Sequence, residues 1–125
     1  MAAGSYFQLF TRDDQDAVSY AAGEAIFEAG DEGDCFFVVR SGEVSLHSDD
    51  HELETVTAGG ILGEMALIDG QPRNLSATAV TDSELVRVDE NRFLYLVQEA
   101  PYFAQEVMRV MAERLRVTTQ RLGGN

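Results

Sequence analysis

The sequence predicts a mainly β fold with flanking helices, in which a double-stranded β-helix, or jelly-roll barrel, precedes a long C-terminal helix. Turn signals recur at intervals of roughly ten residues between short apolar segments, which is typical of a barrel or jelly roll. Residues 35–40 form a nearly continuous apolar run, which indicates a strand buried on both faces. Near the C-terminus, a heptad-like stripe predicts a long helix. The stripe consists of Phe103, Val107, Val110, Met111, Arg114, Leu115 and Thr118.

The predicted strands are short and are separated by glycine-rich or acidic turns. They comprise residues 18–20, 25–27, 35–40, 43–47, 53–57, 76–80 and 84–88. The fourth and fifth segments flank the polar loop 48–51, which predicts a hairpin. The last two flank the turn 81–83, which predicts a second strand pair that closes the barrel. Ahead of the strands, an apolar cluster within residues 1–12 predicts a short helix that packs on a neighbouring element.

Two helices are predicted after the strands. Asp89 has the side chain of a helix N-cap, and apolar residues follow it at helical spacing. Pro101 suits the first position of a second helix, because its missing N–H is not needed there. Gly123 and Gly124 predict the end of that helix.

The length of 125 residues is that of a typical domain, and we expect a single domain over residues 1–125. Its β-roll is predicted at about 13–89, including a site loop at 59–79, and its C-terminal helices at about 90–122.

The composition limits the cellular setting and the partners. Hydrophobic residues make up 45%, enough for one core, and we find neither an apolar run of membrane-spanning length nor an N-terminal signal segment. Cys35 is the only cysteine and has no partner for an internal disulfide. We therefore expect a cytoplasmic protein. The net charge of −13 opposes binding to nucleic acid and to acidic membrane surfaces, because both need a clustered basic face.

The stretch 59–79 contains a candidate phosphate site. Three glycines let the backbone turn tightly before residues 64–68, which are long enough for one or two helical turns. The unpaired N–H groups of such a helix start favour a phosphate, and Arg73 can supply a permanent positive charge. Glu64 would be repelled by that phosphate unless it accepted hydrogen bonds from another group, such as a neighbouring ribose hydroxyl.

The same stretch resembles the phosphate-binding cassette of the cyclic nucleotide-binding domain family. The resemblance lies in Gly-Glu-Met-Ala-Leu, an acidic glycine turn, Pro-Arg and a strand of small residues. It implies that Gly63 and the backbone amides of Met65 and Ala66 hold the cyclic phosphate. It also implies that Glu64 binds the ribose 2′-hydroxyl and that Arg73 pairs with the phosphate oxygens. The implied ligand is cyclic AMP or cyclic GMP, with no cofactor and no metal.

The sequence departs from the family pattern directly after this arginine. The family usually has Ser, Thr or Ala followed by Ala, whereas this chain has Asn74 and Leu75. Asn74 can offer its amide to a phosphate oxygen. Leu75 either crowds the pocket or turns into the core.

The order of elements extends the resemblance over nearly the whole chain. Residues 111–119 are similar to the dimer helix of catabolite activator proteins, in which a Thr-Ser pair contacts the adenine. By position, Thr118 and Thr119 carry that role, although they are equally well explained as surface threonines near a frayed helix end. Leu46 and Leu53 would line the base pocket. No helix-turn-helix follows, so the resemblance does not imply direct DNA binding.

Three function classes compete. The leading hypothesis is a cyclic nucleotide sensor, not an enzyme, in which ligand contacts reposition the last two helices and alter a surface for an unidentified effector. We favour cyclic AMP, because adenine offers threonine hydroxyls both a ring acceptor and an amino donor. The apolar stripe either packs on its own barrel or pairs with a second copy as a homodimer.

The second hypothesis is a degenerate fold member that acts as a protein-interaction module without ligand, for which Asn74 and Leu75 are the evidence. The third is a cupin-like enzyme, which needs clustered His and carboxylate metal ligands. The only histidines, His47 and His51, flank an exposed acidic loop and are more simply explained as solvated side chains.

Overall fold

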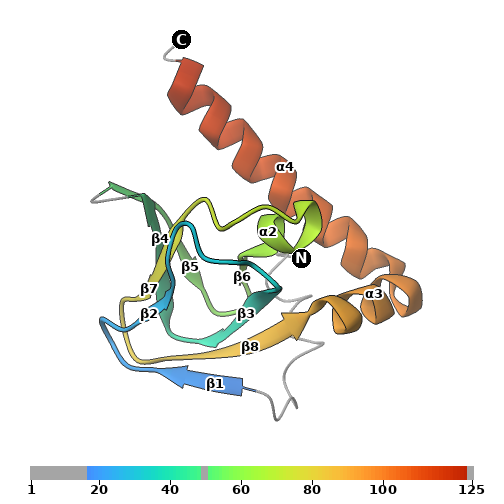
Figure 1. Ribbon diagram of the computed structural model, residues 1–125, viewed down its shortest axis with the longest axis horizontal. Helices are drawn as coiled ribbons and strands as arrows, with labels where there is room; N and C mark the ends of the chain where they lie inside the picture. Colours follow the sequence, from blue (N-terminus) through green and yellow to red (C-terminus); the bar gives the residue numbers. More distant parts are fainter. Residues whose placement is uncertain (1–16, 49–50, 124–125) are drawn as a thin grey trace.

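The computed structural model describes the backbone of residues 17–48 and 51–123, and the side chains in these ranges up to Val117. The helix predicted within residues 1–12 lies outside the described residues. The elements are β1 (Ala17–Tyr20), β2 (Ala25–Phe27), β3 (Cys35–Ser41), β4 (Glu43–Ser48), β5 (His51–Thr57), β6 (Ile61–Leu62), α2 (Glu64–Asp69), β7 (Ser76–Ala79), β8 (Ser83–Asp89), α3 (Glu90–Glu99) and α4 (Pro101–Gly123). Figure 1 shows two sheets with the helices at one end of the roll, so the predicted mainly β class with flanking helices is confirmed.

The strands form two four-stranded antiparallel sheets, with the orders β1-β8-β3-β6 and β2-β7-β4-β5. The sheets remain separate and do not join into the closed barrel that the sequence suggested. The predicted pairing of residues 76–80 with 84–88 is wrong, because β7 pairs with β2 and β4 whereas β8 pairs with β1 and β3. The turn between them bonds to a third strand instead: the Val80 amide and the Ser83 hydroxyl both donate to the Glu43 carbonyl.

The hairpin predicted around residues 48–51 is confirmed, since β4 pairs with β5. Its register shifts where Leu46 faces Glu54 and His47 faces Glu52, so β5 has one extra residue, Leu53, at this point. His47 lies inside β4, half-buried, with Nε2 at 2.9 Å from Oγ1 of Thr78. The expectation of a solvated His47 is therefore wrong.

Strand β3 contributes side chains to two hydrophobic clusters, one inside the roll and one under the helices. Its residues from Cys35 to Val39 are buried, as the apolar run predicted. Phe37 and Val39 pack into a cluster between the two sheets, and Phe36 and Val38 pack into a second cluster under α3 and α4. Alternate side chains of one strand thus face different layers, which is why the strand has no polar face.

The C-terminal helices begin where the sequence predicts. Asp89 is the N-cap of α3 and its side chain accepts a hydrogen bond of 2.9 Å from the Arg92 amide. Helix α4 begins at Pro101 and buries Phe103 and Val107 in the second cluster. Figure 1 shows α4 passing α2 and continuing beyond the sheets. Within the described chain, no helix combines the length and the apolar character needed to cross a bilayer.

Candidate functional site

Helix α2 lies between two glycines whose backbone conformations are left-handed. Gly63 precedes it with φ of 83°, and Gly70 follows it with φ of 70°. L-amino acids rarely adopt this left-handed conformation, so both positions favour glycine. The helix start has no side-chain cap, which leaves the first amides of α2 without a side-chain acceptor. Glu64, Ala66 and Leu67 are the buried residues of the helix.

Arg73 is a buried cation that has no counter-charge among the described residues. Its residue is 6% exposed, Nη1 donates to the Gly63 carbonyl at 2.9 Å, and Nη2 donates to the Cys35 carbonyl at 2.8 Å. The guanidinium carbon also lies 4.2 Å from the ring centroid of Phe27. These partners are neutral, Nε has no partner, and no described carboxylate forms an ion pair with Arg73. Because an uncompensated buried charge is costly, this arrangement favours the binding of an anion.

The backbone and two glycines fix this guanidinium. The Arg73 amide donates to the Asp31 carbonyl at 2.8 Å, and the Arg73 carbonyl accepts from the Gly30 amide at 2.7 Å. A Cβ added at Gly63 would overlap Nη1 of Arg73, and one added at Gly33 would lie 3.1 Å from Nε. The β2–β3 loop therefore places the arginine, and the missing side chains leave room for it.

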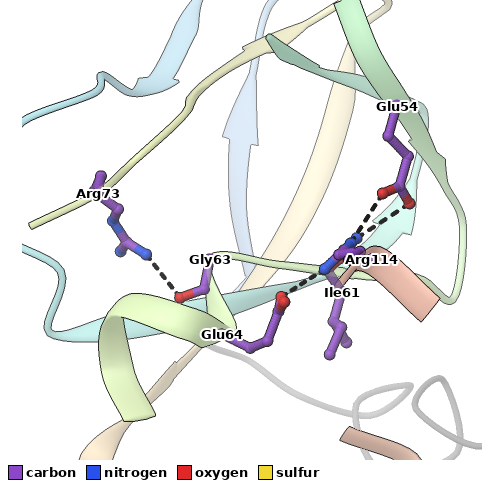
Figure 2. A network of polar contacts seen from close by, with 6 residues as sticks. All are labelled: Glu54, Ile61, Gly63, Glu64, Arg73 and Arg114. Carbon is purple, nitrogen blue, oxygen red and sulfur yellow. Dashed lines mark hydrogen bonds and ion pairs between the residues drawn. The ribbon is translucent and has the colours of Figure 1, made fainter. Parts of the chain in front are cut away.

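Glu64 is buried to 2% exposure and pairs with Arg114 of α4. Nη1 of Arg114 donates to Oε1 of Glu64 at 2.6 Å, as Figure 2 shows. The same guanidinium donates to both carboxylate oxygens of Glu54, at 2.9 and 3.2 Å, and to the Ile61 carbonyl at 2.6 Å. One arginine thus connects α4 with β5, β6 and α2.

Two groups at the site have shifted pKa values. Burial by itself lowers the pKa of Arg114, but its hydrogen bonds and charge interactions with Glu54 and Glu64 outweigh this and raise it. Arg114 therefore stays charged. Burial raises the pKa of the Cys35 thiol, although Arg87 and Arg73 oppose this effect.

A narrow cavity of about 40 Å³ lies between α2, the arginines and the β2-β7-β4-β5 sheet. It is lined by Phe27, Leu46, Gly63, Glu64, Met65, Ala66, Arg73, Asn74, Leu75 and Arg114. The volume is far below the roughly 300–1,000 Å³ of typical ligand pockets. A nucleotide-sized ligand therefore needs the surrounding side chains to move.

The structure brings together seven of the ten residues that the sequence assigned to a ligand: Leu46, Gly63, Glu64, Met65, Ala66, Arg73 and Asn74. Leu53, which lies at the register shift of β5, does not line the cavity. Thr118 and Thr119 lie on α4 beyond Arg114, and their side chains lie outside the described part of the structure. Leu75 was expected either to crowd the pocket or to turn into the core. It lines the cavity and also packs against the core between the sheets.

The sequence did not predict four residues of the site: Phe27, Gly33, Cys35 and Arg114. The first three precede the site loop along the chain, and Arg114 was assigned only to the helix stripe. A sequence signal existed for Arg114, because a charged residue inside an apolar stripe needs a partner.

A larger hollow of about 360 Å³ lies on the other side of α2. Its lining includes the carboxylates of Glu32, Asp34 and Glu90, which would repel an anion. We therefore place the candidate anion site in the narrow cavity with Arg73. Among the described residues, no group of three or more His, Cys, Asp or Glu side chains is placed to hold a metal ion.

The chain is similar to one known family and to several known proteins. The model of the family described as "Cyclic nucleotide-binding domain" matches residues 17–100. The chain is 34% identical over 102 residues to the cyclic AMP receptor protein of Thermus thermophilus, which covers 78% of this chain and 47% of the relative. A relative from Mycobacterium tuberculosis, a CRP-like cAMP-activated global transcriptional regulator, is 29% identical and is covered to 49%. The chain thus spans about half the length of the curated relatives it matches.

Solved structures have the same fold. The catabolite activator protein of Thermus thermophilus superimposes with a TM-score of 0.76 at 34% identity, over 97% of this chain and 55% of that one. The EAL enzyme Bd1971 in its cGMP-bound form gives a TM-score of 0.63 at 38% identity, over 84% and 29%. Its cAMP-bound form gives 0.62 at 35% identity, over 86% and 30%.

Replacing Gly63 by alanine tests whether the packing of Arg73 depends on this glycine. Alanine at Gly63 or Gly70 would suffer left-handed strain of roughly 1–2 kcal/mol. Only at Gly63 does the new Cβ also overlap Arg73, since the space around Gly70 is open. We expect Gly63→Ala to lower the free energy of unfolding by roughly 1–3 kcal/mol more than Gly70→Ala, as measured by urea denaturation. Equal losses would show that Arg73 adapts without strain.

Proposed function

The chain belongs to the cyclic nucleotide-binding domain family, and on this premise we propose that it is a sensor domain for a 3′,5′-cyclic nucleotide. The observation that carries the proposal is the buried guanidinium of Arg73, which has no described ion-pair partner. A cyclic phosphate carries one negative charge and would neutralise it. The uncapped first amides of α2, including those of Met65 and Ala66, supply further donors, and Gly63 permits the close approach.

Glu64 is proposed to accept a hydrogen bond from the ribose 2′-hydroxyl. A carboxylate next to a phosphate is repelled, but Arg114 already compensates the charge of Glu64 through its 2.6 Å contact. The base would lie against Leu46, with Thr118 and Thr119 as the proposed contacts of its polar edge. We propose cyclic AMP as the preferred ligand, and this choice is supported by the cyclic AMP receptor relative. We expect a small margin over cyclic GMP, because threonine hydroxyls can also bind guanine. The solved structures of Bd1971 in both cGMP-bound and cAMP-bound forms support this part of the proposal.

Ligand binding is proposed to act on α4. The cavity must widen to admit a nucleotide, and Arg114 of α4 lies on its wall. A ribose hydroxyl that approaches Glu64 therefore changes the surroundings of the residue that joins α4 to the roll. The surface altered in this way would be read by an effector, which we propose to be another protein or another part of a longer chain.

A homodimer through α4 is the proposed assembly. Val107 of the predicted stripe is buried in the protein's own core, so it is not free for a partner. Met108, Leu115 and Val117 are exposed on the same helix, at 61%, 56% and 46%. Exposed apolar side chains on a long helix suit pairing with a second copy.

A ligand-free interaction module is the second candidate function. The narrow cavity favours it, because Leu75 occupies space that a smaller residue would leave open. Calorimetric titration with cyclic AMP and cyclic GMP separates the two functions. We expect saturable binding of cyclic AMP, and no heat with either nucleotide would leave the interaction module as the better explanation.

Arg73→Leu should remove the main charge partner of the phosphate. We expect the variant to bind cyclic AMP more weakly by roughly 2–5 kcal/mol, because the ligand charge is then left buried and unpaired. Arg109→Leu is the matched control, since it removes the same charge from an exposed position on α4. Wild-type affinity in Arg73→Leu would refute the assignment of Arg73.

The role of Glu64 predicts non-additive losses. Glu64→Gln and the use of 2′-deoxy cyclic AMP should each weaken binding, because the first replaces the charged acceptor of the hydrogen bond by a neutral one and the second removes its donor. When both changes are made together, the loss of binding free energy measured by calorimetry should be little larger than the loss from one change alone. Fully additive losses would count against a direct contact between Glu64 and the 2′-hydroxyl.

If the chain forms a dimer through α4, the mass measured in solution should depend on the exposed apolar residues of this helix. Light scattering should report about twice the 13.7 kDa of one chain when cyclic AMP is saturating. Leu115→Glu should reduce this mass, because a charge would be buried at the interface. Val80→Glu changes an equally exposed apolar residue on the roll and should leave the mass unchanged. A monomer under all conditions contradicts the proposed assembly.

A further inference from the structure

Arg114 divides its guanidinium between two carboxylates in an unequal way. The Nε–Nη2 edge faces Glu54, where Nε bonds to Oε1 at 2.9 Å and Nη2 to Oε2 at 3.2 Å. Glu64 receives a bond from Nη1 alone, at 2.6 Å and to Oε1 alone. The two-point contact therefore goes to Glu54 and the one-point contact to Glu64, as Figure 2 shows.

This unequal division determines how many carboxylate oxygens of Glu64 accept no bond from Arg114. A guanidinium that faces a carboxylate with two nitrogens engages both of its oxygens. Because the two-nitrogen edge of Arg114 is directed at Glu54, no bond from Arg114 reaches Oε2 of Glu64. Without Glu54, only the 2.6 Å bond from Nη2 to the Ile61 carbonyl would still hold this edge. Rotation of the guanidinium about that bond towards the buried carboxylate would then be favoured, since attraction is stronger where water is excluded.

We propose that Glu54 is a positioning residue of the ligand site, which orients Arg114 so that Glu64 keeps one carboxylate oxygen for a ribose hydroxyl. This inference rests on the proposed function. Glu54 lies on β5 and does not line the cavity, so it acts through Arg114 and not on the ligand itself.

A purely structural role for Glu54 would have a different signature. Its side chain is 43% exposed, and ion pairs of exposed side chains contribute little to stability because water screens them. The hydrogen bond from Arg114 to Glu54 is also the largest influence that raises the pKa of Arg114. Loss of Glu54 should therefore change the discrimination between ligands much more than the stability of the fold.

The experiment compares 3′,5′-cyclic AMP with its 2′-deoxy analogue by calorimetry, in the wild type and in Glu54→Gln. Glutamine keeps the shape of the side chain but removes the charge that fixes the guanidinium. We expect the affinity for cyclic AMP to fall about tenfold, the order of one hydrogen bond to a charged group, and that for the 2′-deoxy analogue to fall less than about twofold. The preference for the ribose hydroxyl should therefore decrease.

Two further variants make the test specific. Glu52→Gln removes the same charge from the same strand, but Glu52 bonds to Thr55 and not to Arg114, so both affinities should stay at wild-type values. In an Arg114→Lys background there is no two-nitrogen edge to orient, and Glu54→Gln should then leave the ratio of the two affinities unchanged.

The outcomes separate this inference from the proposed function. Equal losses for both ligands in Glu54→Gln, or the same change of ratio in the Arg114→Lys background, would overturn the role of Glu54 while cyclic nucleotide binding stands. A wild-type protein that binds neither cyclic AMP nor cyclic GMP would overturn the proposed function, and the role of Glu54 with it.

Discussion

The site depends on keeping the charge of Arg73 buried with no carboxylate from the described part of the chain paired to it. A guanidinium in this position would normally attract one of the many acidic side chains of a chain with net charge −13. Here the carbonyl oxygens of Gly63 and Cys35 and the ring of Phe27 surround it, and the absence of a side chain at Gly63 leaves room for the guanidinium. The result is a local positive charge inside an acidic protein, and such a site suits a small anion better than a polyanion.

Strand β3 connects this site with the C-terminal helices. The Cys35 carbonyl accepts from Arg73, and the next residue, Phe36, stacks on Phe103 of α4 with ring centroids 6.2 Å apart. The anion site and the anchoring of α4 are therefore only one residue apart on a fully buried strand. Close-packed side chains, rather than a loop, therefore join the two.

Local features could be predicted from the sequence, and features that join distant segments could not. The short helix after Gly63, the cap at Asp89 and the restart at Pro101 depend on residues within one or two turns, so their chemistry is readable along the chain. The pairing of β7 depends on β2 and β4, which lie much earlier in the sequence. The role of Arg114 was hidden for the same reason, because its partners lie 50 and 60 residues away.

The position of Arg114 along α4 has a mechanical consequence. Helix α4 continues to Gly123, and the residues directly after Arg114, Leu115 to Val117, are exposed. The backbone from Arg114 to Gly123 is a lever arm about 13 Å long at the usual helical rise, so a tilt of about 10° at its pivot would move the far end by about 2 Å. That displacement matches the helix shifts with which regulatory proteins transmit signals. A small tilt of α4 at Arg114 would thus appear as a larger displacement at the far end of the helix.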